Sequence, residues 1–141
     1  MYRDTNPVFR RRHDPSMIWA IAVGGAAGTV VRYLLSLSMQ RSTGAFPFGT
    51  FLINVTGSFL IGILARVLGT PTSSPVLRAA LTIGFCGGFT TFSTFSVDFV
   101  TMVEQGRALR AIVYVVASVT VGISATVLGL YLGNRIISPR V

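Results

Sequence analysis

The residues best suited to chemistry lie in one stretch, GFCGGFTTFSTFSVD, at positions 84–98. It holds three glycines, four phenylalanines and five hydroxyl residues. Hydroxyl groups can donate hydrogen bonds to an anion, and the edge of a phenyl ring carries partial positive charge. Paired glycines weaken a helix, and the backbone at a helix break can turn its carbonyl groups toward a cation. The stretch therefore has groups that could meet either kind of ion, although a packed aromatic stripe in a helix bundle would have the same composition.

A second candidate is Asn54, which lies in the apolar segment that precedes this stretch. Helical spacing places it on one face with Thr50, Gly57 and Ser58. Its amide offers two donors and an acceptor near the middle of the segment. The competing interpretation is an interhelical hydrogen bond that holds a bundle together, which is common in membranes.

Other reactive side chains are few. The one cysteine, Cys86, cannot form an intrachain disulfide and is interpreted as a small buried side chain. His13 lies in a polar tail without a partner histidine, which argues against a metal site there. The sequence has no nucleophile–base pair, metal cluster or phosphate-binding loop, so we do not expect an enzyme.

The elements that must position these residues follow from the composition. Hydrophobic residues make up 51% of the chain, charged residues only 11%, and the mean hydropathy is +0.68. A helix needs about 20 apolar residues to cross a bilayer, and its backbone must be satisfied internally. The sequence therefore predicts an all-α membrane protein with four transmembrane helices, the third broken near its middle. The expected spans are residues 17–39, 46–68, 76–103 and 109–133.

The rest of the chain is predicted to form tails and short links. Residues 1–16 are polar and contain two prolines, which favours a disordered cytoplasmic tail. Residues 17–134 would form one transmembrane domain, and residues 135–141 a short C-terminal tail. The first span is too long for the apolar region of a signal peptide, and three more spans follow it.

The charge of the chain indicates its orientation. Every basic residue is arginine, and the formal net charge is +8. The RRRH run at residues 10–13 could suggest nucleic acid, but the other arginines stand singly at the edges of apolar runs, where they meet lipid headgroups. Four spans place both termini on one side, which the positive-inside rule assigns to the cytoplasm. The arginines on that side are Arg3, Arg10, Arg11, Arg12, Arg78, Arg135 and Arg140, with Arg66 near the boundary, and those on the other side are Arg41, Arg107 and Arg110.

The first and fourth spans each present a distinctive face. Gly24 and Gly28 form a small-xxx-small pair, which favours close helix packing. Arg32 continues this face and is expected either to meet protein or water or to extend to the membrane interface. In the fourth span, Tyr114 and Ser118 share one face with Gly122 and Ala125, for which ordinary packing is the simplest interpretation. Tyr114 could also be an interfacial anchor.

Three segments together resemble one known family. They are GGAAGTVVRY at 24–33, GTFLINVTGSFLIG at 49–62 and GFCGGFTTFSTFSVD at 84–98, and the resemblance covers nearly the whole chain after the tail. The chain resembles the Fluc fluoride channels, also called CrcB proteins. The resemblance implies a fluoride-selective channel that exports cytoplasmic fluoride across the inner (plasma) membrane by passive conduction. It also implies an antiparallel, dual-topology dimer with two pores.

The resemblance assigns a role to individual residues. Arg32 would lie at the aqueous vestibule. The main-chain carbonyls of Gly87 and Thr90, from each subunit, would hold a structural sodium ion at the helix break. The side chains that would line the fluoride pore are Asn54, Phe92, Ser93, Thr94, Phe95, Tyr114 and Ser118.

Three alternatives remain open. The uneven arginine distribution is unusual for a dual-topology homodimer, so the chain could instead pair as a heterodimer with an oppositely oriented homologue. A proton-coupled exporter of fluoride or of small molecules needs a carboxylate within the membrane, and Asp98 is the only candidate because Glu104 lies in a predicted loop. A bundle that only scaffolds partners would explain the glycines, but not the combination of Asn54, Phe92 and Phe95. The expected partners are thus fluoride, a second channel subunit and the lipid bilayer, without nucleic acid.

Overall fold

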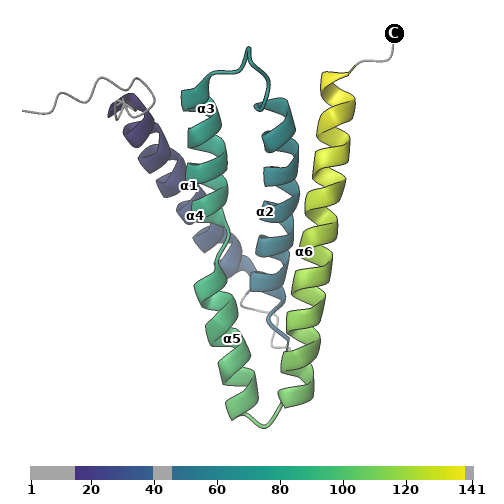
Figure 1. The fold of residues 1–141 in the computed structure, drawn as a ribbon. Coiled ribbons are helices and arrows are strands. Elements are labelled where there is room, and N and C mark those ends of the chain that lie inside the picture. The colour runs from purple at the N-terminus through teal and green to yellow at the C-terminus, as the bar shows by residue number, and fades with distance from the viewer. Residues whose placement is uncertain (1–14, 40–45, 139–141) are drawn as a thin grey trace, which may run out of the picture.

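The computed structural model describes residues 15–39 and 46–138 and folds them into helices joined by short turns (Figure 1). Most of the predicted N-terminal tail, the first link and residues 139–141 lie outside the described residues. Within the described part, four helical segments are long and apolar enough to cross a membrane, which confirms the predicted number. They consist of α1 (Pro15–Met39), α2 (Phe48–Val67), a third segment made of α3 (Pro75–Ala79), η2 (Ala80–Cys86), α4 (Gly87–Phe89) and α5 (Phe92–Glu104), and α6 (Ala108–Ile137).

The third segment is interrupted near its middle, as predicted. Thr90 and Thr91 both have extended backbone, and α5 begins after them. The Thr91 side chain caps α5 by accepting a hydrogen bond from the Thr94 amide at 3.1 Å. Gly87 keeps helical backbone angles, and Gly88 lies within α4. The interruption therefore follows the glycine pair, and its residues are the threonines.

The third segment packs against α1 and, separately, against the pair formed by α2 and α6 (Figure 1). α2 lies between the third segment and α6 and packs along α6. Gly62 on α2 and Gly129 on α6 face each other, since a β-carbon at either one would lie 3.1 Å from the other's α-carbon. α1 crosses obliquely and packs against η2 and α4. Small residues thus allow close backbone approach at both contacts, as membrane helices require.

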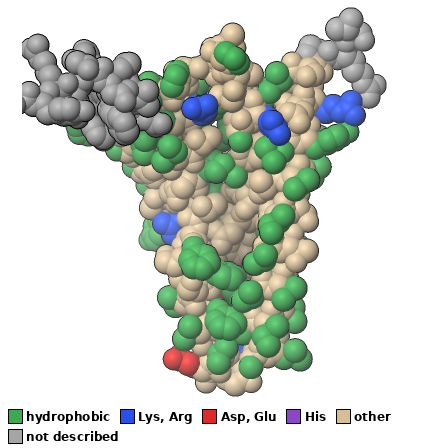
Figure 2. Space-filling model, in the orientation of Figure 1, with side chains coloured by type: hydrophobic (Ala, Val, Ile, Leu, Met, Phe, Trp, Pro, Cys, Tyr) green, Lys and Arg blue, Asp and Glu red, His purple; other side chains and the backbone are tan. Residues whose placement is uncertain are grey.

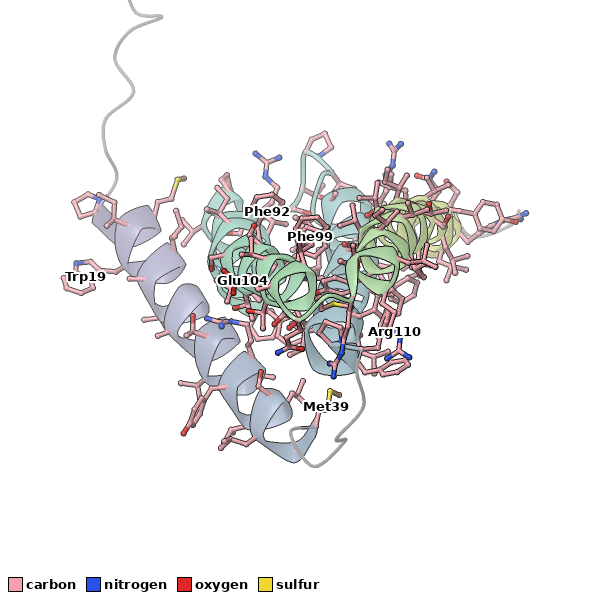
Figure 3. The ribbon with its side chains drawn as sticks, turned by 90° about the horizontal axis from the view of Figure 1, so that it is seen from below. Trp19, Met39, Phe92, Phe99, Glu104 and Arg110 are labelled. Atoms are coloured by element: carbon pink, nitrogen blue, oxygen red, sulfur yellow. The ribbon has the colours of Figure 1, made fainter. Side chains whose placement is uncertain are left out.

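Hydrophobic side chains are spread along the whole length of the surface (Figure 2). Trp19, on the outer side of α1 (Figure 3), is 72% exposed, and Leu109 is 76% exposed. The buried cluster is small and contains Met102, Ala111 and Tyr114, with four phenylalanines packed against it. Exposed apolar surface of this extent fits a lipid environment, where the backbone is satisfied within helices.

Candidate functional site

Asn54 of α2 bridges both polar groups of one residue at the helix break. Its Oδ1 accepts a hydrogen bond from the Thr91 amide at 2.8 Å, and its Nδ2 donates to the Thr91 carbonyl at 3.1 Å. The side chain thus holds the break to α2, in agreement with the interhelical interpretation. One Nδ2 hydrogen remains for another acceptor, because the amide group has two.

The Asn54 bridge changes the hydrogen bonding of the preceding turn. In a continuous helix the Thr91 amide would donate to the Gly87 carbonyl. Here it donates to Asn54, so the Gly87 carbonyl lacks its helical partner. A β-carbon at Gly87 would meet no atom within 4 Å, so this side of the break is open.

The Gly88 carbonyl, one residue later, is bound by α1. Arg32 Nε donates to this oxygen at 3.0 Å, and the Thr29 hydroxyl donates to it at 3.4 Å. A positive charge beside carbonyl groups at the end of a helix is stabilising, because these groups carry the negative end of the helix dipole. The resemblance predicted that Arg32 lies at a vestibule, and the contact that the structure gives it is with the broken helix.

The phenyl rings of the predicted pore form a chain that leads to the buried core. The Phe92 ring is 79% exposed (Figure 3) and lies 5.6 Å from the Phe95 ring, centroid to centroid. Phe95 in turn lies 5.1 Å from Tyr114, against which Phe46 packs edge-on at 5.4 Å. Of these contacts, Phe46–Tyr114 is edge-on, whereas Phe92–Phe95 and Phe95–Tyr114 are tilted, with interplanar angles of 35° and 42°.

Tyr114 is completely buried, so it is not an interfacial anchor. Its hydroxyl donates a hydrogen bond to Asp98 Oδ2 at 3.3 Å. The acid on which the exporter alternative depends is therefore paired with a residue of the predicted pore.

The predicted hydroxyl residues differ in their surroundings. Ser93 and Thr94 are exposed, and their hydroxyls lie 3.2 and 2.9 Å from that of Thr91. Ser118 Oγ is buried and has no hydrogen-bond partner among the described residues. A buried hydroxyl without a partner is uncommon and calls for a water or an ion to satisfy it.

The structure brings four of the predicted site residues to one cavity of about 540 Å³. They are Asn54, Gly87, Thr90 and Phe92. Thr94 instead lines a second cavity, toward the other end of α5. The predicted residues thus fall into a group at the break and a group along α5 and α6.

The break also fits the predicted carbonyl site for a cation. Thr90 is extended, so its carbonyl is outside the helical hydrogen-bond pattern, and Gly87 has lost its helical partner. The described residues contain no cluster of histidine, cysteine or carboxylate groups that could hold a metal. Main-chain oxygens left free at unwound membrane helices are a known mode of binding sodium.

Two residues at the site were not assigned a role from the sequence. Thr91 is both the cap of α5 and the partner of Asn54, and Thr29 shares the Gly88 carbonyl with Arg32. The sequence TTFST does contain a capping signal for Thr91, a hydroxyl residue just before a helix. Thr29 carries no comparable signal, because its contact depends on how α1 packs.

Comparison with known proteins finds one family, in both a family profile and individual relatives. The family profile described as CrcB-like protein, Camphor Resistance (CrcB), matches residues 19–130. The Fluoride-specific ion channel FluC of Rhizobium meliloti (strain 1021) is 46% identical over 117 residues, which cover 82% of this chain and 94% of that protein. FluC of Nitrobacter winogradskyi is 44% identical over 117 residues, 82% of this chain and 93% of that protein. FluC of Acidobacterium capsulatum is 42% identical over 123 residues, 86% of this chain and 98% of that protein.

Proposed function

This chain belongs to the CrcB-like family, and we propose that it is a fluoride-selective channel that releases cytoplasmic fluoride by passive conduction across the inner (plasma) membrane. The relatives are named as ion channels, and the chain is a multi-pass membrane protein and not an enzyme. The observation that carries the proposal is the break at Thr90 and Thr91, bridged by Asn54 and flanked by Phe92.

Fluoride is small and strongly hydrated, so a pore must replace its water with other hydrogen-bond donors. The second Nδ2 hydrogen of Asn54 and the unpaired Ser118 hydroxyl are suited to this, because each has donor capacity left over. The exposed hydroxyls of Ser93 and Thr94 extend the set of donors. Tyr114 contributes the buried wall beside Phe95.

The phenyl rings supply selectivity in this proposal. Phe92 and Phe95 can meet an anion with their positive edges, whereas their faces would repel it. A pathway walled by rings has little room for chloride, which is larger than fluoride. Size and donor number then act together, as in other selective pores.

A second subunit, antiparallel to the first, would complete the site. The carbonyls of Gly87 and Thr90 would hold a structural sodium ion together with the same carbonyls of the partner. Two observations support this: the Gly87 carbonyl lacks its helical partner, and the space beside Gly87 is open in the single chain. When bound, sodium would link the two breaks and offset the cost of bringing an anion nearby. The exposed Phe92 ring would be covered by the same contact.

The identity of the second subunit depends on the charge of the two ends. Arg66, Arg78 and Arg135 lie at the end of the bundle where α3 begins. Most of the basic side chains that are visible in Figure 2 lie at this end. Arg107 and Arg110 lie at the opposite end. With the basic N-terminal segment added, this bias favours one orientation. An oppositely oriented homologue is therefore the alternative to a homodimer.

Fluoride efflux from liposomes tests the proposal. The purified chain alone should release fluoride rapidly while chloride is retained, and Phe92→Ala should reduce the discrimination between the two ions. Release by the pure chain would also mean that it pairs with itself. If fluoride release appears only after co-reconstitution with an oppositely biased homologue, the heterodimer is correct.

The exporter alternative predicts a different result in the same liposomes. Asp98 would couple fluoride to protons, so a pH gradient should then drive fluoride uphill. Absence of fluoride flux under all these conditions would reject the channel and leave a scaffold function.

A further inference from the structure

α2 and α6 lie side by side and run in the same direction (Figure 1). Asn54 on α2 and Ser118 on α6 belong to the proposed pore. One helical turn further along each helix lie Ser58 and Gly122. A β-carbon at Gly122 would lie 3.6 Å from the Ser58 hydroxyl oxygen and would meet no other neighbouring atom within 4 Å. The two residues therefore face each other, and Gly122 leaves room for an additional atom beside the Ser58 hydroxyl.

The Ser58 hydroxyl is free to donate a hydrogen bond. No other described residue forms a hydrogen bond with it, although the Ser58 carbonyl accepts one from Thr126 at 3.1 Å. A serine within a helix often donates to the carbonyl four residues earlier, as Ser96 does to Phe92 at 2.9 Å. Ser58 does not, and it lines the cavity of about 540 Å³ next to Asn54. Its hydrogen is therefore available to an ion or a water molecule.

The contact between the two helices closes one turn beyond Ser58. The Thr126 hydroxyl bonds the carbonyls of Ser58 and Gly122, both at 3.1 Å, so its single hydrogen is already used. At Gly62 and Gly129, a β-carbon on either helix would lie 3.1 Å from the α-carbon of the other, which leaves no room for an ion. Ser58 is thus the last hydroxyl residue of α2 before the two backbones meet.

We propose that Ser58 is a further hydrogen-bond donor of the fluoride path and that Gly122 provides the space in which the ion meets its hydroxyl. This inference rests on the proposed function. Asn54 and Ser118 supply donors at one level of the path, and Ser58 supplies the next, about 5.4 Å further along. This spacing lets fluoride exchange donors in short steps. The steps must be short because fluoride holds its water strongly, so a level without a donor raises the barrier to passage.

Fluoride flux from liposomes containing three variants tests the role of Ser58. Ser58→Ala removes only the hydroxyl and should lower the flux about tenfold, the factor that corresponds to the loss of one hydrogen bond to a charged group. Ser58→Ala with Gly122→Ser moves a hydroxyl to the facing helix, where an added β-carbon makes an ordinary contact, and should restore most of the flux. The matched control is Ser58→Ala with Gly122→Ala, which fills the same space without a donor and should not exceed the flux of Ser58→Ala.

The melting temperature separates this role from a structural one. Because the Ser58 hydroxyl bonds no other described residue, Ser58→Ala should melt at the temperature of the unsubstituted chain. A clear drop in melting temperature would assign the hydroxyl to the stability of the bundle and overturn the inference. If the unsubstituted chain conducts, unchanged flux in Ser58→Ala or equal flux in the two double variants would overturn the inference and leave the proposed function standing.

A binding measurement keeps the two proposals distinguishable. Fluoride, compared with chloride at equal concentration, should raise the melting temperature of the unsubstituted chain in detergent, because an ion that binds only the folded protein stabilises it. The rise should be smaller in Ser58→Ala and return in Ser58→Ala with Gly122→Ser. This pattern in a chain without fluoride flux would support the Ser58 donor and reject the channel function. A fluoride-induced rise of equal size in all variants would overturn the Ser58 donor, and the absence of both the rise and the flux would overturn both proposals.

Discussion

Replacing Asn54 with leucine tests whether one side chain holds the helix break in place. Leucine has the same number of side-chain heavy atoms, branched in the same way, but cannot form the hydrogen bonds at 2.8 and 3.1 Å to the two polar groups of Thr91. A buried backbone group left without a partner costs about 1–3 kcal/mol, whereas hydrogen bonds between membrane helices average about 0.6 kcal/mol. Thr91 is only partly buried, but both of its backbone groups lose their partner at once. We therefore expect the free energy of unfolding to fall by about 2 kcal/mol. Such a loss lowers the melting temperature by roughly 4–8 °C.

The assay is thermal unfolding in detergent, paired with fluoride efflux from liposomes. The control is Thr126→Val, because the Thr126 hydroxyl bonds the Ser58 carbonyl at 3.1 Å and the Gly122 carbonyl at 3.1 Å, away from the break. Thr126→Val should melt close to the unsubstituted chain and keep its flux. If Asn54→Leu melts together with Thr126→Val, the bridge does not stabilise the break and our reasoning is refuted.

A second variant separates the bridge from the donation of a hydrogen bond to the anion. Asn54→Asp keeps an acceptor for the Thr91 amide but replaces both Nδ2 hydrogens with an oxygen. Asn54→Asp should therefore have a higher melting temperature than Asn54→Leu, yet conduct no fluoride. Normal flux in Asn54→Asp would show that the amide donors are not needed for conduction.

Three further substitutions test the surroundings of the break. Arg32→Met removes the donor to the Gly88 carbonyl and should lower the free energy of unfolding in detergent by about 1–2 kcal/mol. Arg32→Lys keeps the positive charge but loses the guanidinium donors, so it should lower this free energy by less. Equal melting temperatures for the two variants would contradict a role for the charge. Gly28→Ala should lower the free energy of unfolding by about 1–3 kcal/mol, because its methyl group would lie 2.9 Å from the Phe89 backbone nitrogen. In the control, Gly25→Ala, the nearest atom is 3.7 Å from the new methyl group, so its melting temperature should stay unchanged. A lower melting temperature for Gly25→Ala than for Gly28→Ala would contradict the packing of α1 against the third segment. Gly87→Ala should leave the melting temperature of the protomer unchanged, because no atom lies within 4 Å of the added β-carbon. It should nevertheless abolish both the dimer, measured by native mass spectrometry, and the fluoride flux. An intact dimer that still conducts fluoride would show that Gly87 is not part of the subunit contact.

Much of the architecture could be predicted from the sequence because it depends on properties that are local to each segment. Length and apolarity define four spans, and the structure confirms their number. Most of the predicted ends lie within a few residues of the observed ones, as for the second span, predicted at 46–68 and observed as α2 (Phe48–Val67). Glycine and hydroxyl composition also predicted that the third span would be broken. These signals are reliable because an apolar run in lipid has few alternatives to a helix.

The location of the break and the partners of its carbonyls were decided by tertiary structure. The glycine pair suggested where the helix is weak, but the extended residues are Thr90 and Thr91, and their position is set by Asn54, 37 residues earlier in the chain. The bond from Arg32 to the Gly88 carbonyl spans 56 residues. Both contacts depend on the rotation and relative height of packed helices, which a periodic pattern leaves undetermined because it defines the face of a helix and not its neighbour. The same reason applies to the second cavity, which Thr94 lines and whose walls come from three helices and a turn. The sequence by itself thus determined which groups are available for binding an ion, and only the packing of the helices decided which of them are used to hold the break and which remain free.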